Sequence, residues 1–402
     1  MSYPTDYRGW LAKLVAFKPV SRDSNLPLIH YVRDYLQTVG IEAVLVHNPE
    51  KTKANLWATL PGEDGATKGG LVLSGHTDVV PVDGQKWSTD PFTTVEKDGN
   101  IYGRGVSDML SFIAIVLALT PYFVQTKRTK PIHYAFSYDE EFGCKGVPFL
   151  IDYLKKNNFE ADACVVGEPT DMRVVTGNKG RTGWAVHVHG KPIHSSAALM
   201  GTSCNAIEYA SQIIAKIRGI ALDIKKNGKK HTGFNECPFA CMTTSMISGG
   251  NAVNTVPEHC NFHFSLWTVE SSDQEDVIRE VQKYVNEQIL PEMKEEFSEA
   301  TVTFDRDTHY PSFFAENENG FHKEARRICN HHSVMKMAGC EAGYYGSDLN
   351  IPTLICGPGS MAAAHVKDEW VEVSKMDQSV EFVKDITKYV CTGNYYKASG
   401  SL

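Results

Sequence analysis

The chain has 402 residues and a formal net charge of -8, with 42% hydrophobic and 22% charged residues. It is long enough for two domains with cores of their own, on a prior of about 150 residues per domain. The acidic balance argues against a general nucleic-acid or membrane-surface role, because either would require a basic field.

The N-terminal segment, residues 1–17, carries early charges and no uninterrupted apolar core, so we expect no signal peptide. The longest apolar run, residues 112–119, is shorter than the roughly 18 residues of a membrane span. The ten cysteines include no Cys-x-x-Cys pair, which is typical of free thiols in a reducing compartment. We therefore predict a cytoplasmic protein.

The first third of the chain alternates helical and strand-like patterns. Apolar residues recur at helical spacing in residues 6–17 and 26–40. Short strands and two further helices then follow, with strands at 42–47, 55–60, 71–76, 132–141 and 161–169 and helices at 108–119 and 147–157. This alternation predicts an α/β domain with a mostly parallel central sheet.

The pattern changes near residue 180. A strand at 181–190, a helix at 204–220, strands at 239–250 and 258–269, a helix at 273–289 and a strand at 300–306 follow one another. The order β-α-β-β-α-β is that of a ferredoxin-like α+β module. A helix at 320–332 and a strand at 351–359 then restore the α/β pattern. We predict a discontinuous catalytic domain, residues 1–180 and 310–402, with an inserted domain at 181–309.

Polar side chains follow several of the predicted strands or lie in glycine-rich turns. They are His76, Asp78, Asp108, Glu140, Glu141, Glu168 and His365. In open α/β sheets, ligands bind outside the carboxyl ends of the strands, so these groups can converge on one crevice. Two histidines with several carboxylates match the ligand set of zinc or another borderline divalent ion.

Two pairs within this set suggest different tasks. His76 and Asp78 lie two residues apart, so on an extended strand Asp78 can orient the imidazole from behind. Glu140 and Glu141 are neighbours and would point in opposite directions, so one can bind metal while the other carries a proton to and from the substrate. Each feature alone also fits a structural role, since a lone histidine at a strand end is most often a hydrogen-bonded structural residue.

Seven segments carry a resemblance to a known family. They read "SGHTDVVPVDGQKWSTDPF", "GNIYGRGVSDM", "SYDEEFGCKGV", "VVGEPTDM", "GNKGRTGWAVHVHGKPIHSS", "GGNAVNTVPEHCNF" and "LICGPGSMAAAHVKDEWVEV". From about residue 7 to 390 the chain resembles the di-zinc amidohydrolase family of acetylornithine deacetylase, succinyl-diaminopimelate desuccinylase, aminoacylase and related carboxypeptidases. Residues 17–36 and 75–92 are most similar to acetylornithine deacetylase.

The resemblance implies two divalent ions per subunit, Zn²⁺ with Co²⁺ as a substitute. His76 and Glu168 would bind one ion, Glu141 and His365 the other, and Asp108 would bridge them.

The same resemblance implies the roles of three further residues. Glu140 would act as general base and then acid, and Asp78 would hold the imidazole of His76. The inserted domain would be a lid through which a homodimer forms, and its His194 would reach the partner's site to stabilise an oxyanion.

Three segments need comparison with the family pattern. Leu110 and Ser111 stand where the family has lysine and glycine after the bridging aspartate. Trp267 replaces an arginine that in several relatives holds the substrate carboxylate, so Arg181 or Lys179 would have to supply that contact. Glu341 would either meet a cationic end of the substrate or stabilise a turn.

The implied function is hydrolysis of the N-acyl amide of an acylated amino acid. N2-acetylornithine, cleaved to ornithine and acetate in arginine biosynthesis, is the favoured substrate. An aminoacylase, a succinyl-diaminopimelate desuccinylase and a dipeptidase share the site and stay open as alternatives. Leu110 and Trp267 also leave room for a non-catalytic dimeric binding protein, against which the complete ligand set and Glu140 argue.

Overall fold

The computed structural model describes residues 2–231, 233–234, 237–269, 272–315, 318–331, 335–337 and 339–392. The chain divides into two compact units. Unit 1 comprises residues 1–178 and 313–402, and unit 2 comprises residues 179–312. Among the helices in these ranges, none combines the length and the apolar character that crossing a bilayer requires.

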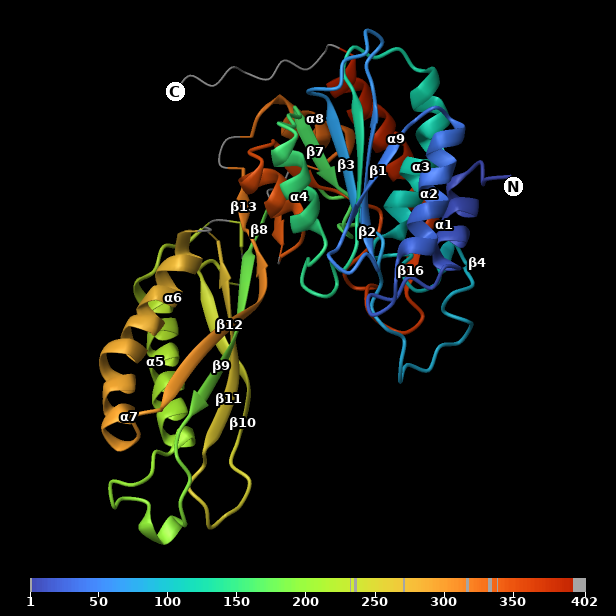
Figure 1. Ribbon diagram of the computed structural model, residues 1–402. Helices are drawn as coiled ribbons and strands as arrows, with labels where there is room; N and C mark the ends of the chain where they lie inside the picture. Colours follow the sequence, from blue (N-terminus) through green and yellow to red (C-terminus); the bar gives the residue numbers. More distant parts are fainter. Residues whose placement is uncertain are drawn as a thin grey trace. The chain divides into compact units, whose positions relative to one another are not determined.

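A nine-stranded sheet forms the centre of unit 1 (Figure 1). Its strands are β1 (Ala43–His47), β2 (Ala54–Leu60), β3 (Leu71–His76), β6 (Ile132–Ser137), β7 (Ala163–Val166), β8 (Val175–Asn178), β13 (Phe313–Phe314), β14 (Met335–Met337) and β15 (Thr353–Ile355). The central strands β6, β3, β7 and β15 are parallel, and β1, β2 and β13 pair antiparallel toward the edges. The central four are buried along their whole length, as expected for parallel strands that are covered on both faces.

Helices cover both faces of this sheet, so the predicted α/β class is confirmed. They are α1 (Tyr7–Val15), α2 (Leu26–Thr38), α3 (Leu110–Gln125), α4 (Val147–Lys156), α8 (Gly320–Ile328) and α9 (Val373–Cys391). All except α4 contribute to one hydrophobic core with the sheet, and α4 lies on the opposite face (Figure 1). The helix α9 was not predicted.

The helix α3 extends beyond its predicted end at residue 119. It continues through Pro121, which has no N–H to donate to the carbonyl of Leu117. The hydroxyl of Tyr35 donates to that carbonyl instead, at 3.1 Å. This contact from α2 satisfies the acceptor that the proline leaves open.

A small antiparallel sheet that the sequence did not indicate also belongs to unit 1. It contains β4 (Val95–Lys97), β5 (Asn100–Tyr102) and β16 (Trp370–Glu372) in the order β16-β5-β4. The pairing of β5 with β16 brings the segment before Asp108 beside the segment after His365. Two predicted site segments that are far apart in sequence therefore meet through this sheet.

Unit 2 has the predicted β-α-β-β-α-β order. Its elements are β9 (Gly180–His189), α5 (Ala206–Asn227), β10 (Cys241–Gly249), β11 (His259–Thr268), α6 (Ser272–Tyr284), α7 (Leu290–Glu296) and β12 (Thr301–Tyr310). The sheet is antiparallel throughout, in the order β10-β11-β9-β12, and its helices pack on one face (Figure 1). The single helix expected at 273–289 is instead α6 followed by a π-helical turn and α7, which begins beside Pro291.

Unit 2 is inserted between two neighbouring strands of unit 1. Phe313 of β13 pairs directly with Asn178 of β8 in antiparallel register.

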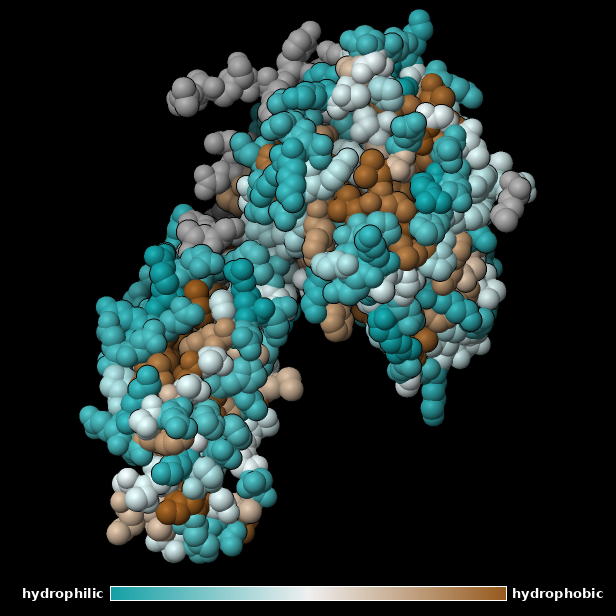
Figure 2. Space-filling model, viewed as in Figure 1, coloured by the Kyte–Doolittle hydropathy of each residue, from teal (hydrophilic) through white to brown (hydrophobic). Residues whose placement is uncertain are grey.

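Hydrophilic residues cover most of the visible surface of each unit, with hydrophobic residues in smaller patches (Figure 2).

Candidate active site

The site is organised around Asp108, whose two carboxylate oxygens face different histidines. Asp108 Oδ1 lies 3.0 Å from His76 Nε2, and Oδ2 lies 3.2 Å from His365 Nε2. His76 is the last residue of β3, and Asp108 lies just before α3. The peptide bond after Asp108 is cis.

Two carboxylates complete the groups around these histidines. Glu168 follows β7, and its Oε1 lies 4.0 Å from His76 Nε2. Glu141 follows β6, and its Oε1 lies 2.9 Å from His365 Nε2. The structure thus brings all five predicted metal ligands together in two triads that share Asp108, each with its ligand atoms within 4.8 Å of one another.

The charges of this cluster fit divalent cations. Burial raises the pKa of Glu141 to about 7, and the charge of Asp108 adds to this effect. Burial and the same aspartate raise the pKa of Glu168 well above its usual range. Glu168 Oε1 is also buried without a hydrogen-bond partner among the described residues. Cations held between these groups would compensate the carboxylates and satisfy that oxygen.

The imidazole of His76 is oriented so that one ring nitrogen can bind a metal ion. Its Nδ1 donates a hydrogen bond to the backbone carbonyl of Asp78, at 2.9 Å, which leaves Nε2 as the ligand atom. Burial opposes the charged ring, but the hydrogen bond to Asp108 and the nearby carboxylates raise the pKa of His76 well above its usual range.

The Asp78 carboxylate is placed differently from the expectation. Its Oδ1 lies 3.7 Å from His76 Nδ1, beyond hydrogen-bond distance. It accepts instead from the backbone N–H groups of Glu140, at 3.1 Å, and Glu141, at 3.4 Å, and from Ser21 Oγ, at 2.7 Å. The backbone of Asp78 therefore orients the imidazole, and its carboxylate holds the segment that carries the paired glutamates.

Glu140 lies beside the two triads and belongs to neither. Its Oε1 accepts a hydrogen bond from Cys144 Sγ, at 3.5 Å. Burial raises the pKa of Glu140 well above its usual range; the charge of His76 opposes the shift, and those of Glu141 and Glu341 add to it. A carboxyl group that takes up a proton this readily is suited to proton transfer.

A buried ion pair that the sequence did not indicate supports Asp108. Glu369 accepts from the backbone N–H of Asp108, at 3.1 Å, and from Arg104 Nη1, at 2.6 Å. Arg104 Nη2 donates to Gln85 Oε1, at 2.6 Å, and Gln85 Nε2 donates to the carbonyl of His365, at 3.0 Å. His365 has a left-handed backbone, with φ of 63°, and this contact helps to hold it there.

Two positions near the site have structural partners. Glu341 is buried, accepts from Ser137 Oγ at 2.8 Å, and has a pKa raised to about 7 by burial. Leu110 is fully buried at the start of α3, where its N–H donates to the carbonyl of Gly105, at 2.9 Å. In this chain Leu110 therefore serves the packing of α3.

The remaining predicted residues lie in unit 2. His194 is exposed in the segment after β9, and its Nδ1 lies 2.9 Å from Ser196 Oγ. The guanidinium of Arg181 lies 5.5 Å from the ring centroid of Trp267, and the rings of Trp267 and Tyr310 form a T-shaped pair. Lys179 Nζ donates to the carbonyl of Phe239, at 3.2 Å.

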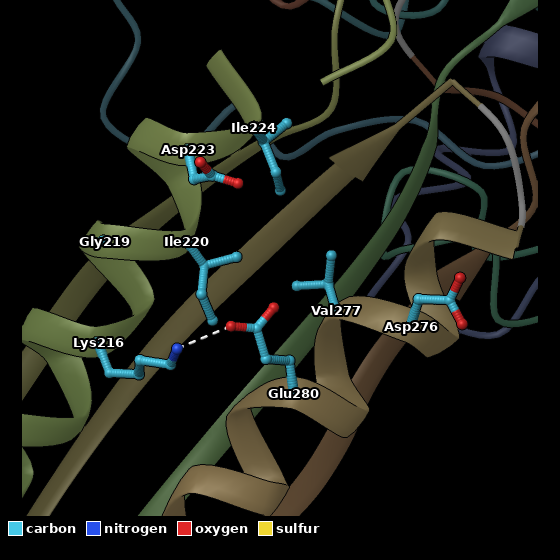
Figure 3. Close-up of a pocket in the computed structure, with 8 residues that line it drawn as sticks. All are labelled: Lys216, Gly219, Ile220, Asp223, Ile224, Asp276, Val277 and Glu280. Atoms are coloured by element: carbon cyan, nitrogen blue, oxygen red, sulfur yellow. Dashed lines mark hydrogen bonds and ion pairs between the residues drawn. The ribbon is translucent and has the colours of Figure 1, made fainter. Parts of the chain in front are cut away.

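A cavity of about 320 Å³ lies between α5 and α6 in unit 2 (Figure 3). An ion pair between Lys216 and Glu280, at 2.7 Å, forms part of its wall, together with the apolar side chains of Ile220 and Val277. None of the predicted site residues lines it. The cavity is therefore separate from the candidate active site.

The chain is similar to known proteins along most of its length. Residues 72–389 match the sequence profile of peptidase family M20/M25/M40. The chain is 30% identical to an acetylornithine deacetylase of Pasteurella multocida strain Pm70 over 378 residues, which cover 92% of each protein.

Solved structures share the fold at lower identity. One is an M20 family metallo-carboxypeptidase of Sulfolobus solfataricus, with a TM-score of 0.73, 17% identity and coverage of 95% of this chain and 98% of that one. Another is a dinuclear metal-binding peptidase of the M20 family from Bacillus subtilis, with a TM-score of 0.62, 14% identity and coverage of 95% and 97%.

Proposed function

Since the chain belongs to peptidase family M20/M25/M40 and is a metal-dependent amidohydrolase, we propose that it removes the acyl group from an N-acylated amino acid. The favoured substrate is N2-acetylornithine, which would be cleaved to ornithine and acetate as a step of arginine biosynthesis. The observation that carries the proposal is the pair of metal-ligand triads joined at Asp108, with Glu140 beside them and in neither. The match to acetylornithine deacetylases over almost the whole chain supports the substrate.

In this proposal the two triads hold two divalent ions, Zn²⁺ with Co²⁺ as a substitute. His76 and Glu168 would hold one ion, Glu141 and His365 the other, and Asp108 would contact both. Bound ions of this kind polarise the substrate carbonyl and lower the pKa of the attacking water.

Glu140 would perform the proton transfers. Its carboxylate accepts a proton as the water oxygen adds to the acyl carbon, and it then delivers that proton to the nitrogen as the C–N bond breaks. Glu140 is suited to this shuttle because it lies beside both triads and belongs to neither. The hydrogen bond from its backbone N–H to Asp78 keeps the carboxyl group in place for both transfers.

Unit 2 would be the lid and the dimerisation domain, consistent with its division from unit 1 as a compact body. Its His194 would donate to the oxyanion in the partner subunit's site, a contact worth roughly 3–4 kcal/mol in the transition state. Closure of a lid would also exclude bulk water from the reaction. The ten free cysteines suit a cytoplasmic location.

A substrate panel tests the proposal. It compares acetylornithine, other N-acetyl amino acids, succinyl-diaminopimelate and dipeptides, each with zinc or cobalt added. The highest kcat/KM on acetylornithine is expected. A dipeptide as the best substrate would refute the substrate assignment, and no hydrolysis of any member by metal-loaded protein would refute the hydrolase.

A further inference from the structure

Another cluster of histidines with a carboxylate lies in unit 2, where β9 ends and β11 begins. His189 is the last residue of β9, His259 is the first residue of β11, and the two are direct partners in the antiparallel register. Glu258 immediately precedes His259. Two imidazoles and a carboxylate thus meet at one end of the sheet, within unit 2 alone.

The distances in this cluster are those of ligands around a common centre. Glu258 Oε1 lies 3.5 Å from His189 Nε2, and Oε2 lies 3.7 Å from His259 Nε2. Both separations exceed a hydrogen bond. They are close to the separation of about 3.4 Å that two ligands have around a tetrahedral zinc ion with metal–ligand bonds near 2.05 Å.

The two rings are also held in a fixed relation to one another. The imidazoles of His189 and His259 stack with a centroid distance of 4.9 Å and an angle of 19°. The ring of Phe297 meets His189 edge-on, at 5.9 Å. These two ring contacts reduce the rotamer freedom that binding an ion would otherwise remove from His189.

We propose that His189, Glu258 and His259 form a surface site for a borderline divalent ion such as Zn²⁺, Ni²⁺ or Cu²⁺. Imidazole with one carboxylate suits these ions and disfavours Mg²⁺ or Ca²⁺, which prefer oxygen ligands. Three protein ligands leave a further coordination position open to water. The site shares no residue with the candidate active site and does not depend on the proposed reaction.

The position of the site links it to the segment that carries His194. The backbone N–H of Gly190 donates to the carbonyl of Glu258, at 2.7 Å. The backbone N–H of Val256 donates to the carbonyl of Ile193, at 2.8 Å. Beyond them, His194 forms a β-bridge with Thr255. An ion held by Glu258 and the two histidines would join both chain segments at their base and restrict the motion of His194.

The first test counts bound metal. Full-length protein is first loaded with two equivalents of zinc, and further zinc is then titrated in competition with a chromophoric chelator. The wild type is expected to bind one equivalent more than His259→Gln and Glu258→Gln, each checked for folding by circular dichroism. His187→Gln is the matched control, because His187 lies two residues earlier on β9 and contacts Asn261 instead of Glu258. Equal stoichiometry in wild type and both site variants would overturn the proposal.

A second test needs no substitution. Ni²⁺ is added to wild-type protein that has been loaded with only two equivalents of zinc, and the ring C–H signals of the histidines are followed by NMR. Selective broadening of the His189 and His259 signals at low nickel concentration is expected. Broadening of His187 at the same or lower concentration would show adventitious surface binding and would overturn the assignment.

Discussion

Arg104 and Glu369 form an ion pair with 2.6 Å between Nη1 and Oε2, and each side chain is only 1% exposed. The other oxygen of Glu369 accepts the backbone N–H of Asp108. The pair therefore stands directly behind the residue that joins the two candidate metal-ligand triads. A buried pair of this kind adds little net stability, but removal of one partner leaves a buried charge uncompensated.

Glu369→Gln should therefore destabilise the protein and loosen the metal site together. We expect a loss of about 3–5 kcal/mol in the free energy of unfolding because the Arg104 charge stays buried. Zinc affinity should fall about 10- to 100-fold because Asp108 loses support from behind. Urea unfolding and competitive zinc titration measure the two effects. Asp83→Asn, which breaks an exposed pair with Arg22 of the same 2.6 Å length, is the control and should change neither quantity appreciably.

Glu140→Gln separates metal binding from proton transfer. The amide keeps the size of the side chain but cannot take up the proton, so kcat should fall about 10²- to 10⁴-fold. The zinc content should stay that of the wild type because Glu140 is in neither triad. Steady-state kinetics and elemental analysis of the same sample provide the check. Turnover near the wild-type rate would show that another group is the base.

Asp78→Asn tests which part of Asp78 orients His76. The backbone carbonyl that accepts from His76 is unchanged in this variant, so zinc affinity should stay within about tenfold of the wild type. The amide can no longer accept from both Glu140 and Glu141 backbone N–H groups, so kcat should fall far more than affinity. A loss confined to zinc affinity would mean that the carboxylate holds the imidazole after all. Ser21→Ala leaves the Asp78 carboxylate in place and removes a hydroxyl that contacts it and the carbonyl of Val79, so it is the milder control.

His194→Ala and Glu140→Gln should complement one another if His194 acts across a dimer. Each variant alone should be nearly inactive. After equal mixing and subunit exchange, half of the dimers are mixed and each has one intact site, so about one quarter of the wild-type activity should return. Absence of recovery, with exchange shown by mass-tagged subunits, would refute a contribution of His194 to the partner's site.

His133 should make the stability of the protein depend on pH. Burial lowers the pKa of His133 to about 4. Its Nε2 donates to the carbonyl of Gly69, at 2.9 Å, and its Nδ1 accepts from Thr59 Oγ1, at 2.9 Å, so the neutral ring is the form that fits. Below about pH 6.5 His133 binds a proton in the unfolded chain but stays neutral in the folded chain. The free energy of unfolding therefore falls as the pH falls.

Between pH 7.5 and pH 5 this single group should cost about 2 kcal/mol of unfolding free energy. His133→Gln should show a correspondingly smaller loss over the same range, measured by urea unfolding at equal zinc load. His47→Gln, which changes an exposed histidine on β1, should retain the full pH dependence. A His133→Gln profile parallel to that of the wild type would contradict the expectation.

The sequence predicted the site best where a candidate site residue lies at the carboxyl end of a buried strand. His76 and Glu168 come at or just after the ends of β3 and β7, whose continuous apolar runs are readable without a structure. Parallel strands place such ends at one edge of the sheet, so their convergence could be inferred. The triads have the membership that the family resemblance implied for the two ions.

Strand alternation predicted side-chain direction poorly for residues that lie beyond the end of a strand. β3 ends at His76 and β6 at Ser137, so neither Asp78 nor the two glutamates lies on a regular strand. Asp139 has a left-handed backbone, with φ of 55°, which turns the chain before Glu140. Side-chain direction after these ends depends on long-range hydrogen bonds. Arg104 and Glu369, 265 residues apart, could not be paired from local patterns for the same reason.

The direct pairing of Asn178 with Phe313 makes the insertion of unit 2 topologically simple. The chain leaves unit 1 on one strand and returns on its neighbour, so at this point unit 2 occupies the place of a hairpin turn. Arg181 and Tyr310 repeat the same pairing at the start of unit 2. A lengthened loop or an added helix inside unit 2 therefore leaves the register of the central sheet unchanged. Such an arrangement allows the inserted unit to diversify while the metal-ligand scaffold is inherited intact.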